Sequence, residues 1–275
     1  MSTLIYQAVV LAGERQNSNP LAQHFGTDAG VLVDVEGKSC IDRVLDCLQA
    51  SQHIRTIAVA GPAPEVLSAN PELQHRLNTA PDIQWFAPQN GPAASALEVA
   101  EQLDTWPAVL TSGDHALLNQ STLDQFCQDA HVVSLESDVV VGFVPYATVI
   151  NAYPDTLRTR LRFRNGDYCG SNLFILKTAQ SKSVLAFWQT VERLRKQPWK
   201  MAARLGLPTL IKYLCGQLTV DEAMARLSIL SGCTISWVTI NDPRAAVDVD
   251  SLNDWTLASA ILAEEQSKKN HAGQQ

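Results

Sequence analysis

The stretch Tyr6–Arg15 (YQAVVLAGER) decides the fold. Its first seven residues form a short, continuous, β-branched apolar run, which predicts a buried strand over Tyr6–Ala12. The run ends at Gly13, and a glycine at the carboxyl end of a strand lets the backbone turn and approach a ligand. Because ligands of open α/β sheets bind at that end, we expect a ligand site here, with the Arg15 guanidinium meeting a triphosphate. A plain strand-to-loop turn with a solvated Arg15 is the alternative.

Apolar runs and amphipathic helical patterns alternate after this first strand. The predicted strands cover residues 56–60, 108–111 and 138–144, and the predicted helices cover residues 39–50, 93–103 and 121–130. The last of these helices begins with Ser121-x-x-Asp124, which has capping-box spacing. Repeated strand–helix units of this length indicate a parallel sheet with helices on both faces.

The pattern changes in the second half of the chain. Residues 161–164 and 168–176 flank Asn165-Gly166, which predicts a hairpin. Helices over 185–196, 201–215, 220–230 and 254–263 and a strand over 235–240 follow, with Ser251 as a cap of the last helix. We therefore expect a single domain over residues 1–265, with a lobe inserted at about 150–235, and a polar, frayed tail over 266–275.

The composition narrows the class of protein. The chain has 275 residues, of which 46% are hydrophobic and 18% charged, and its net charge of −7 disfavours binding to nucleic acid. Six cysteines without a CxxC pair argue against a zinc site or a disulfide framework and fit a reducing cytoplasm. Met1–Gln7 lacks the features of a signal peptide, and no apolar run approaches the length of a membrane span.

Aspartates at the ends of two distant strands are the candidate metal ligands. Asp114 follows the strand that ends near residue 111, and Asp248 and Asp250 alternate with valines, which places both carboxylates on one face if the segment is extended. Such carboxylates repel one another unless a cation lies between them, and a shared pair suits Mg²⁺ bound to a nucleoside triphosphate. The alternatives are that Asp114 is only a cap and that Asp250 only begins the next helix. His115 is better explained as an exposed loop histidine than as a metal ligand.

Basic residues offer candidate phosphate contacts. Four arginines alternate in RTRLRFR, namely Arg158, Arg160, Arg162 and Arg164, so an extended backbone would place all four on one face. Arginine binds phosphate oxygens in a bidentate manner, so the row could contact an acceptor phosphate. A charged edge strand that resists aggregation is an equally good interpretation of the row. Lys200 is a further candidate phosphate contact, and a surface lysine is its alternative.

Four short motifs occur in an order that is known from one family. They are Leu11-Ala12-Gly13…Arg15, Val35-Glu36-Gly37-Lys38, Gly113-Asp114 and Asp248-Val249-Asp250-Ser251…Asp254. In this order the chain, from Val9 to Leu262, resembles the MobA-like nucleotidyltransferases of the nucleotide-diphospho-sugar transferase superfamily. The resemblance implies an α/β, Rossmann-like GT-A-type three-layer fold, with a mostly parallel sheet and an antiparallel hairpin lobe on the acceptor side.

The resemblance also implies a reaction. Such enzymes move a nucleoside monophosphate from an NTP to a small phosphorylated acceptor with release of pyrophosphate, using Mg²⁺ or Mn²⁺. By position, Asp114 and Asp250 would hold the metal, with Asp248 in reserve, and Arg15 would contact the triphosphate. The implied substrate contacts are Leu11, Ala12, Gly13, Gly91, Arg158, Arg160, Asn172 and Lys200.

Two residues depart from the family pattern. Glu14 stands where the family has a second glycine, and Gly30 stands where it has a lysine. These departures keep a second hypothesis open, a non-catalytic nucleotide-binding or regulatory protein of the same fold. A third hypothesis is a glycosyltransferase of the same fold, which would need an Asp-x-Asp motif after a middle strand, whereas this chain has Ser112-Gly113-Asp114.

Overall fold

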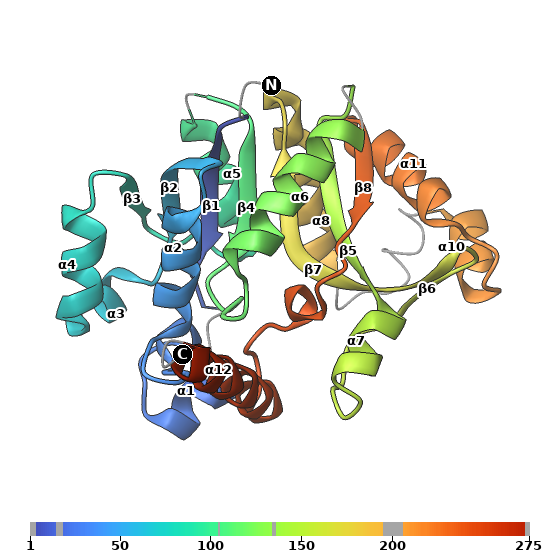
Figure 1. Cartoon of the computed structure of the whole chain (residues 1–275). Coiled ribbons are helices and arrows are strands. Elements are labelled where there is room, and N and C mark those ends of the chain that lie inside the picture. The colour runs from blue at the N-terminus through green and yellow to red at the C-terminus, as the bar shows by residue number, and fades with distance from the viewer. Residues whose placement is uncertain (1–3, 15–18, 104, 134–135, 195–205, 273–275) are drawn as a thin grey trace.

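The computed structural model describes residues 4–14, 19–103, 105–133, 136–194 and 206–272, and within them one sheet organises the molecule (Figure 1). Its strands are β1 (Tyr6–Leu11), β2 (Ile54–Ala60), β3 (Ile83–Phe86), β4 (Ala108–Ser112), β5 (Val139–Pro145), β6 (Leu161–Phe163), β7 (Gly166–Leu176) and β8 (Ile235–Thr239). Their order is β3-β2-β1-β4-β7-β5-β8, and β6 pairs with β7. All neighbours are parallel except the pairs that contain β7.

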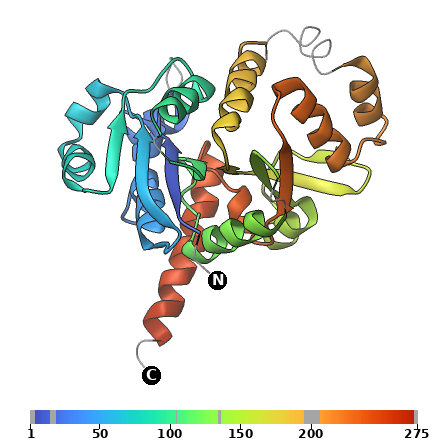
Figure 2. The ribbon, with the colours of Figure 1, turned by 90° about the horizontal axis from the view of Figure 1, so that it is seen from above.

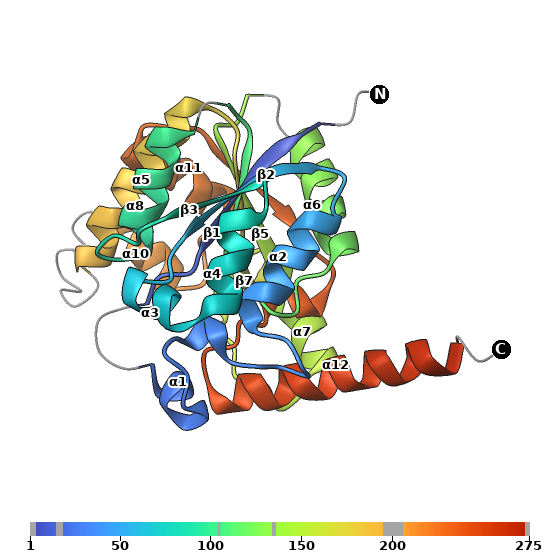
Figure 3. The ribbon, with the colours of Figure 1, turned by 90° about the vertical axis from the view of Figure 1, so that its left-hand side faces the viewer.

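Helices cover both faces of the sheet. The α-helices are α1 (Pro20–Phe25), α2 (Cys40–Ala50), α3 (Pro64–Ala69), α4 (Pro71–Thr79), α5 (Pro92–Gln102), α6 (Gln120–Val133), α7 (Tyr146–Ala152), α8 (Lys182–Leu194), α10 (Leu207–Leu214), α11 (Val220–Ser231) and α12 (Leu252–Ala272). Short 3₁₀ turns are η1 (Gly30–Leu32), η2 (Ala179–Ser181) and η3 (Pro243–Ala246). Figure 3 shows α2 and α6 on one side of the sheet and α5, α8 and α11 on the other, and each side has its own apolar cluster. The predicted three-layer α/β fold is therefore confirmed.

The hairpin is built differently from the expectation. Its long strand β7 lies in the middle of the sheet between β4 and β5, so it belongs to the central layer as well as to the 150–235 segment. Leu173, Ile175 and Leu176 are almost fully buried, which is typical of a strand covered on both faces. Phe163 pairs with Gly166, so the turn residues are Arg164 and Asn165 and not Asn165-Gly166. The Asn165 side chain instead accepts a hydrogen bond from the Val220 amide at 3.1 Å and ties the turn to α11.

Two helix boundaries also differ from the expectation. Asn119, and not Ser121, caps α6, because its side-chain oxygen accepts a hydrogen bond from the Thr122 amide at 3.1 Å. Ser251 caps α12 as predicted, since the Asp254 amide donates to its hydroxyl at 3.3 Å. That helix continues to Ala272, so the expected tail is helical over residues 266–272, and Figure 2 shows the helix projecting from the body of the molecule. An ion pair between Lys268 and Glu264 at 2.7 Å, one turn apart, supports this last part.

The carboxyl edge of the sheet is closed from below in Figure 1 by α1 and α12. A third apolar cluster joins three parts of the chain, namely α1, the segment that precedes α2, and α12 together with the residues before it. Its buried members include Leu21, Val33, Val247, Val249 and Ala258. In the described part of the chain, no helix has the length and apolar character that a membrane span requires.

Candidate functional site

A pocket of about 650 Å³ lies at the carboxyl ends of β1 and β4. Six of the predicted site residues line it, namely Leu11, Gly13, Asp114, Asn172, Asp248 and Asp250. This is the edge at which ligands of open α/β sheets bind, so a pocket lies where the sequence predicts a ligand site, and binding there stays a prediction.

Backbone hydrogen bonds bring the two aspartate segments together. The Gly113 amide donates to the Leu11 carbonyl at 2.9 Å, which extends the pairing of β1 and β4 to the start of the loop. The Val249 amide donates to the Asp114 carbonyl at 3.0 Å, which joins segments that are far apart in the sequence. Val247 and Val249 are fully buried, and the alternating aspartates Asp248 and Asp250 line the pocket, as the period of two predicted.

Burial and neighbouring charge perturb two of the pocket carboxylates, those of Asp114 and Asp248. Burial, followed by the charge of Asp250, raises the pKa of Asp114 to about 6. Burial, followed by the charges of Asp114 and Asp250, raises the pKa of Asp248 to about 8, although Arg158 and a hydrogen bond from Asn172 act in the opposite direction. One oxygen of Asp114 and one of Asp248 are buried without a hydrogen-bond partner. A cation between these groups would compensate for both the repulsion and the missing partners.

The donor set fits a hard divalent cation. Mg²⁺ and Mn²⁺ prefer carboxylate oxygens, and Mg²⁺ commonly uses one or two carboxylates together with water and substrate phosphates. No three His, Cys, Asp or Glu side chains among the described residues are arranged so that they alone could hold a metal ion. A cation bound to Asp114 and Asp250 would therefore take its other ligands from water and from a bound phosphate.

The two departures from the family pattern are in direct contact. The Glu14 carboxylate accepts a hydrogen bond from the Gly30 amide, and both residues line the pocket. A Cβ atom at Gly30 would lie 3.2 Å from this carboxylate and would also meet the Asn19 side chain. The space beside Gly30 is thus filled by Glu14 and Asn19, so the pocket wall is acidic at this point. No lysine or arginine is among the described residues that line the pocket.

Asn172 lies where the carboxyl end of β4 meets β7. Its backbone has a φ of 50°, an uncommon value for a residue other than glycine, and strained backbones of this kind cluster at functional sites. Its amide nitrogen is 3.5 Å from the Ser112 hydroxyl, and its side chain also bonds Asp248. Asn172 lines the pocket, and its contact with a substrate stays a prediction.

Other predicted contacts lie outside the pocket. Ala12 is fully buried in the core. Gly91 is the N-cap of α5 and lies beside the Glu192 carboxylate, whereas its neighbour Pro92 lines the pocket. Gly13 does line it, and its missing side chain makes room for Pro88, whose Cβ would lie 2.7 Å from a Cβ at Gly13. Arg15 and Lys200, for which phosphate contacts were predicted, fall outside the described residues.

The arginine row has partners within the protein. Arg158 forms an ion pair with Asp254, and the two side chains are only 11% and 13% exposed. Arg160 pairs with Asp167, and its guanidinium lies 5.0 Å from the centre of the Tyr146 ring. Neither arginine lines the pocket. The predicted row of four is also incomplete as a strand face, because β6 covers only Leu161–Phe163.

The interpretation of His115 as an exposed loop residue is wrong. Its side chain is fully buried, and burial lowers its pKa to about 4, so the ring is neutral near pH 7. The Thr111 hydroxyl lies 3.4 Å from its Nδ1 atom. Residues 116–118, which follow it, are also buried, so this segment is part of the protein interior.

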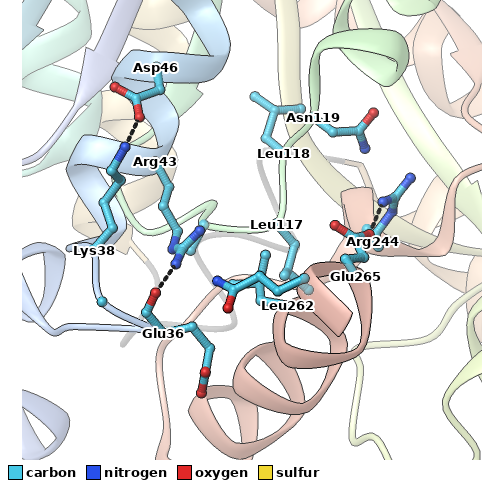
Figure 4. A pocket seen from close by; sticks show the side chains of 13 residues that line it. Glu36, Lys38, Arg43, Asp46, Leu117, Leu118, Asn119, Arg244, Leu262 and Glu265 are labelled. Atoms are coloured by element: carbon cyan, nitrogen blue, oxygen red, sulfur yellow. Dashed lines mark hydrogen bonds and ion pairs between the residues drawn. The ribbon is translucent and has the colours of Figure 1, made fainter. Parts of the chain in front are cut away.

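A second pocket, of about 360 Å³, lies between α2 and α12 (Figure 4). Its cationic side chains are already engaged. Lys38 pairs with Asp46, Arg43 donates to the carbonyl of Glu36, and Arg244 pairs with Glu265. Because these cationic side chains already have partners within the protein, we interpret the second pocket as a gap between packed elements and not as a ligand site.

Sequence reasoning missed part of the first pocket. Ser112 directly precedes Gly113-Asp114, and its side-chain hydrogen bond to Asp114 partly opposes the rise in the pKa of that carboxyl that burial causes. Its place beside the aspartate was a usable signal. Phe174 and Trp188 also line the pocket. Their apolar character indicated only a buried position, because the local pattern does not show that α8 and β7 face the same pocket.

The fold and the pocket define a Rossmann-like α/β protein with an acidic site at the carboxyl edge of its sheet. A sequence model of the MobA-like NTP transferase domain matches residues 8–174. The chain therefore belongs to the MobA-like NTP transferase family, as the order of its motifs indicated.

Solved structures share this fold. A hypothetical transferase from Thermus thermophilus is 25% identical, with a TM-score of 0.75, covering 92% of this chain and 100% of its own. A 4-diphosphocytidyl-2C-methyl-D-erythritol synthase from Anaerococcus prevotii shares the fold at 10% identity, with a TM-score of 0.56 and coverage of 95% and 97%. A CMP:2-keto-3-deoxy-manno-octonic acid synthetase complexed with CTP does so at 13% identity, with a TM-score of 0.55 and coverage of 96% and 100%. No protein of curated function matches the sequence.

Proposed function

We propose that this protein is a divalent-cation-dependent nucleotidyltransferase that moves a nucleoside monophosphate from an NTP to a small phosphorylated acceptor. The observation that carries the proposal is the meeting of Asp114 and Asp250 at the carboxyl edge of the sheet, where the Val249 amide bonds the Asp114 carbonyl. Family membership supports the NTP as substrate. The relative that was solved with CTP makes CTP the first nucleotide to test.

The proposed reaction is an in-line displacement at the α-phosphorus. An oxygen of the acceptor phosphate forms a bond to this phosphorus, the bond to the bridging oxygen of the β-phosphate breaks, and the electron pair leaves with pyrophosphate. A phosphate acceptor is already ionised near pH 7, so no residue needs to remove a proton. Mg²⁺ or Mn²⁺ held by Asp114 and Asp250 would offset charge on the phosphates. Asn172 would orient the acceptor or the sugar through its amide.

The acidic wall formed by Glu14 bears on the alternatives. Glu14 contacts Gly30, and none of the described residues that line the pocket is basic. Both observations support slow turnover or a nucleotide-binding descendant without catalysis. The glycosyltransferase alternative has less support, because Ser112 stands where its metal motif requires an acid.

The test is pyrophosphate release with each of four NTPs, Mg²⁺ or Mn²⁺, and a panel of phosphorylated acceptors. We expect one NTP to be consumed only when an acceptor and the cation are both present. Asp129→Asn is the matched control for variants of the pocket aspartates, because Asp129 is a partly exposed aspartate on α6 that does not line the pocket. Binding of an NTP without turnover by any acceptor would favour the non-catalytic alternative, and failure to bind any NTP would exclude both.

A further inference from the structure

An apolar cavity of about 410 Å³ lies between the sheet and the helix layer formed by α8 and α11. Val141 and Phe143 of β5 line one side of it, and Leu185, Phe187 and Met224 of the two helices line the other. This volume is within the usual range for small-molecule sites. The space is open to solvent at Gly170, and apolar surface that is left uncovered in a hollow of this size is typical of a ligand-binding groove.

The cavity adjoins the acidic pocket. Leu110, Asn172, Phe174 and Trp188 line both spaces. Asn172 thus has its side chain beside Ser112 and Asp248 while it also borders the apolar cavity. A single ligand that passes this junction would have a polar end among the aspartates and an apolar end under α8.

Gly170 supports the view that the cavity is open space. It lies on β7, lines the cavity and pairs with Phe143, and a Cβ atom added there would meet no atom within 4 Å. Its φ is not in the positive range that favours glycine, so a larger residue would fit the backbone. Phe174 and Trp188 are only partly buried although they pack against the apolar cluster of this face.

We propose that this cavity binds the hydrocarbon part of the acceptor, and that the acceptor is an amphipathic phosphate monoester. This rests on the proposed function, because the acidic pocket would receive the phosphate end through a bound cation and Asn172. Apolar walls and a single polar junction favour a hydrocarbon chain over a sugar or a polyol, since each hydroxyl of such a ligand would lose its hydrogen bonds in the cavity.

Binding of n-alkyl phosphates of increasing length tests the proposal without any catalytic step. Calorimetry with Mg²⁺ and the full-length protein, below micelle-forming concentrations, should show affinity rising by about fourfold for each added methylene until the cavity is filled. The heat-capacity change of binding should become more negative with length. Equal affinity for ethyl and octyl phosphate would overturn the inference.

Gly170→Leu places bulk in the cavity, and Ala186→Leu adds similar bulk to the exposed side of α8 as a matched control. We expect Gly170→Leu to weaken octyl phosphate at least about tenfold, the equivalent of roughly two methylenes, and to leave ethyl phosphate unchanged. The control should match the wild type. Leu227→Gln, which makes the lining polar, is a second variant with the same expected selectivity. Loss of affinity that is equal for both phosphates in both cavity variants would contradict the proposal.

The two proposals fail in different ways. Chain-length-dependent binding without NTP turnover would support the apolar site and count against nucleotidyl transfer. Turnover of an NTP with a short, polar phosphate acceptor, together with affinity that does not depend on chain length, would support the proposed function and overturn this inference.

Discussion

Asp242 and Asp248 lie on one short segment and have opposite surroundings. Burial by itself raises the pKa of Asp242, but hydrogen bonds from Arg244, Thr122 and Asn119 outweigh it and lower this pKa to about 2. Burial and the neighbouring carboxylates raise the pKa of Asp248 to about 8, and one of its oxygens has no hydrogen-bond partner. The surroundings thus stabilise the charged form of Asp242 and disfavour the charged form of Asp248.

The difference separates structural acids from candidate functional ones. The Asp242 cluster ties η3 to the start of α6, and its carboxylate accepts from Asn119 at 2.8 Å and from Arg244 at 2.9 Å. The pocket aspartates destabilise the cation-free fold, because like charges are held together in a poorly solvated place. Such perturbed groups in a cleft are a physical indicator of a functional site.

Asp114→Asn should have the largest effect on activity. It removes a proposed cation ligand, so we expect turnover to fall by at least about a hundredfold, the scale for losing one electrostatic contact in a transition state. It also removes a charge that opposes burial, so the free energy of unfolding without cation should stay unchanged or rise. Pyrophosphate release and thermal unfolding measure the two quantities. Parallel losses of activity and stability would place Asp114 with the structural acids.

Cation binding should stabilise the wild type. With Mg²⁺ or Mn²⁺ at a hundred times its dissociation constant, the free energy of unfolding should rise by about 2.7 kcal/mol. Asp250→Asn should lose most of this gain, because it removes one of the two proposed ligands. Asp242→Asn should keep it, since Asp242 does not line the pocket. Thermal melts with and without EDTA provide the measurement, and an equal gain in all three proteins would argue against a cation site at Asp250.

The part of the site that the sequence predicted follows from short-range rules. Alternation of valine and aspartate in residues 246–250 placed both carboxylates on one face, and the position of Asp114 after a strand placed it at the correct edge of the sheet. The strand and helix at Tyr6–Leu11 and Cys40–Ala50 were likewise visible as periodic patterns.

The remaining features depend on long-range packing. The antiparallel position of β7 between β4 and β5 joins residues from distant parts of the chain, and no local pattern encodes that pairing. The counter-charges of Arg158 and Arg160 come from Asp254 and Asp167, and the first of these lies on α12, far along the chain. His115 was assigned to an exposed loop because burial of a loop depends on what packs over it.

Asp242→Asn should have its main effect on stability. The lowered pKa of Asp242 means that the folded state favours the charged carboxylate, which corresponds to about 2 kcal/mol of stability at pH 7. This contribution is complete above the unfolded pKa near 3.8 and is lost as the pH falls towards the folded value of about 2. Denaturant unfolding of both proteins from pH 7 to pH 2 should therefore show a difference that shrinks at the acid end. A constant difference over that range would mean that lost packing, and not lost charge, causes the effect.

Glu14→Gln should give the smallest effect and bears most directly on the second hypothesis. Glutamine keeps an oxygen that can accept from the Gly30 amide, so the variant removes the charge and retains the contact. Removing a repulsion of about 1 kcal/mol should lower the KM for the NTP about fivefold, with kcat less affected. Glu101→Gln, at an exposed site near the far end of α5, is the matched control. An increase in KM would instead mean that Glu14 assists NTP binding, and the pocket would then contain four acids that act through a cation.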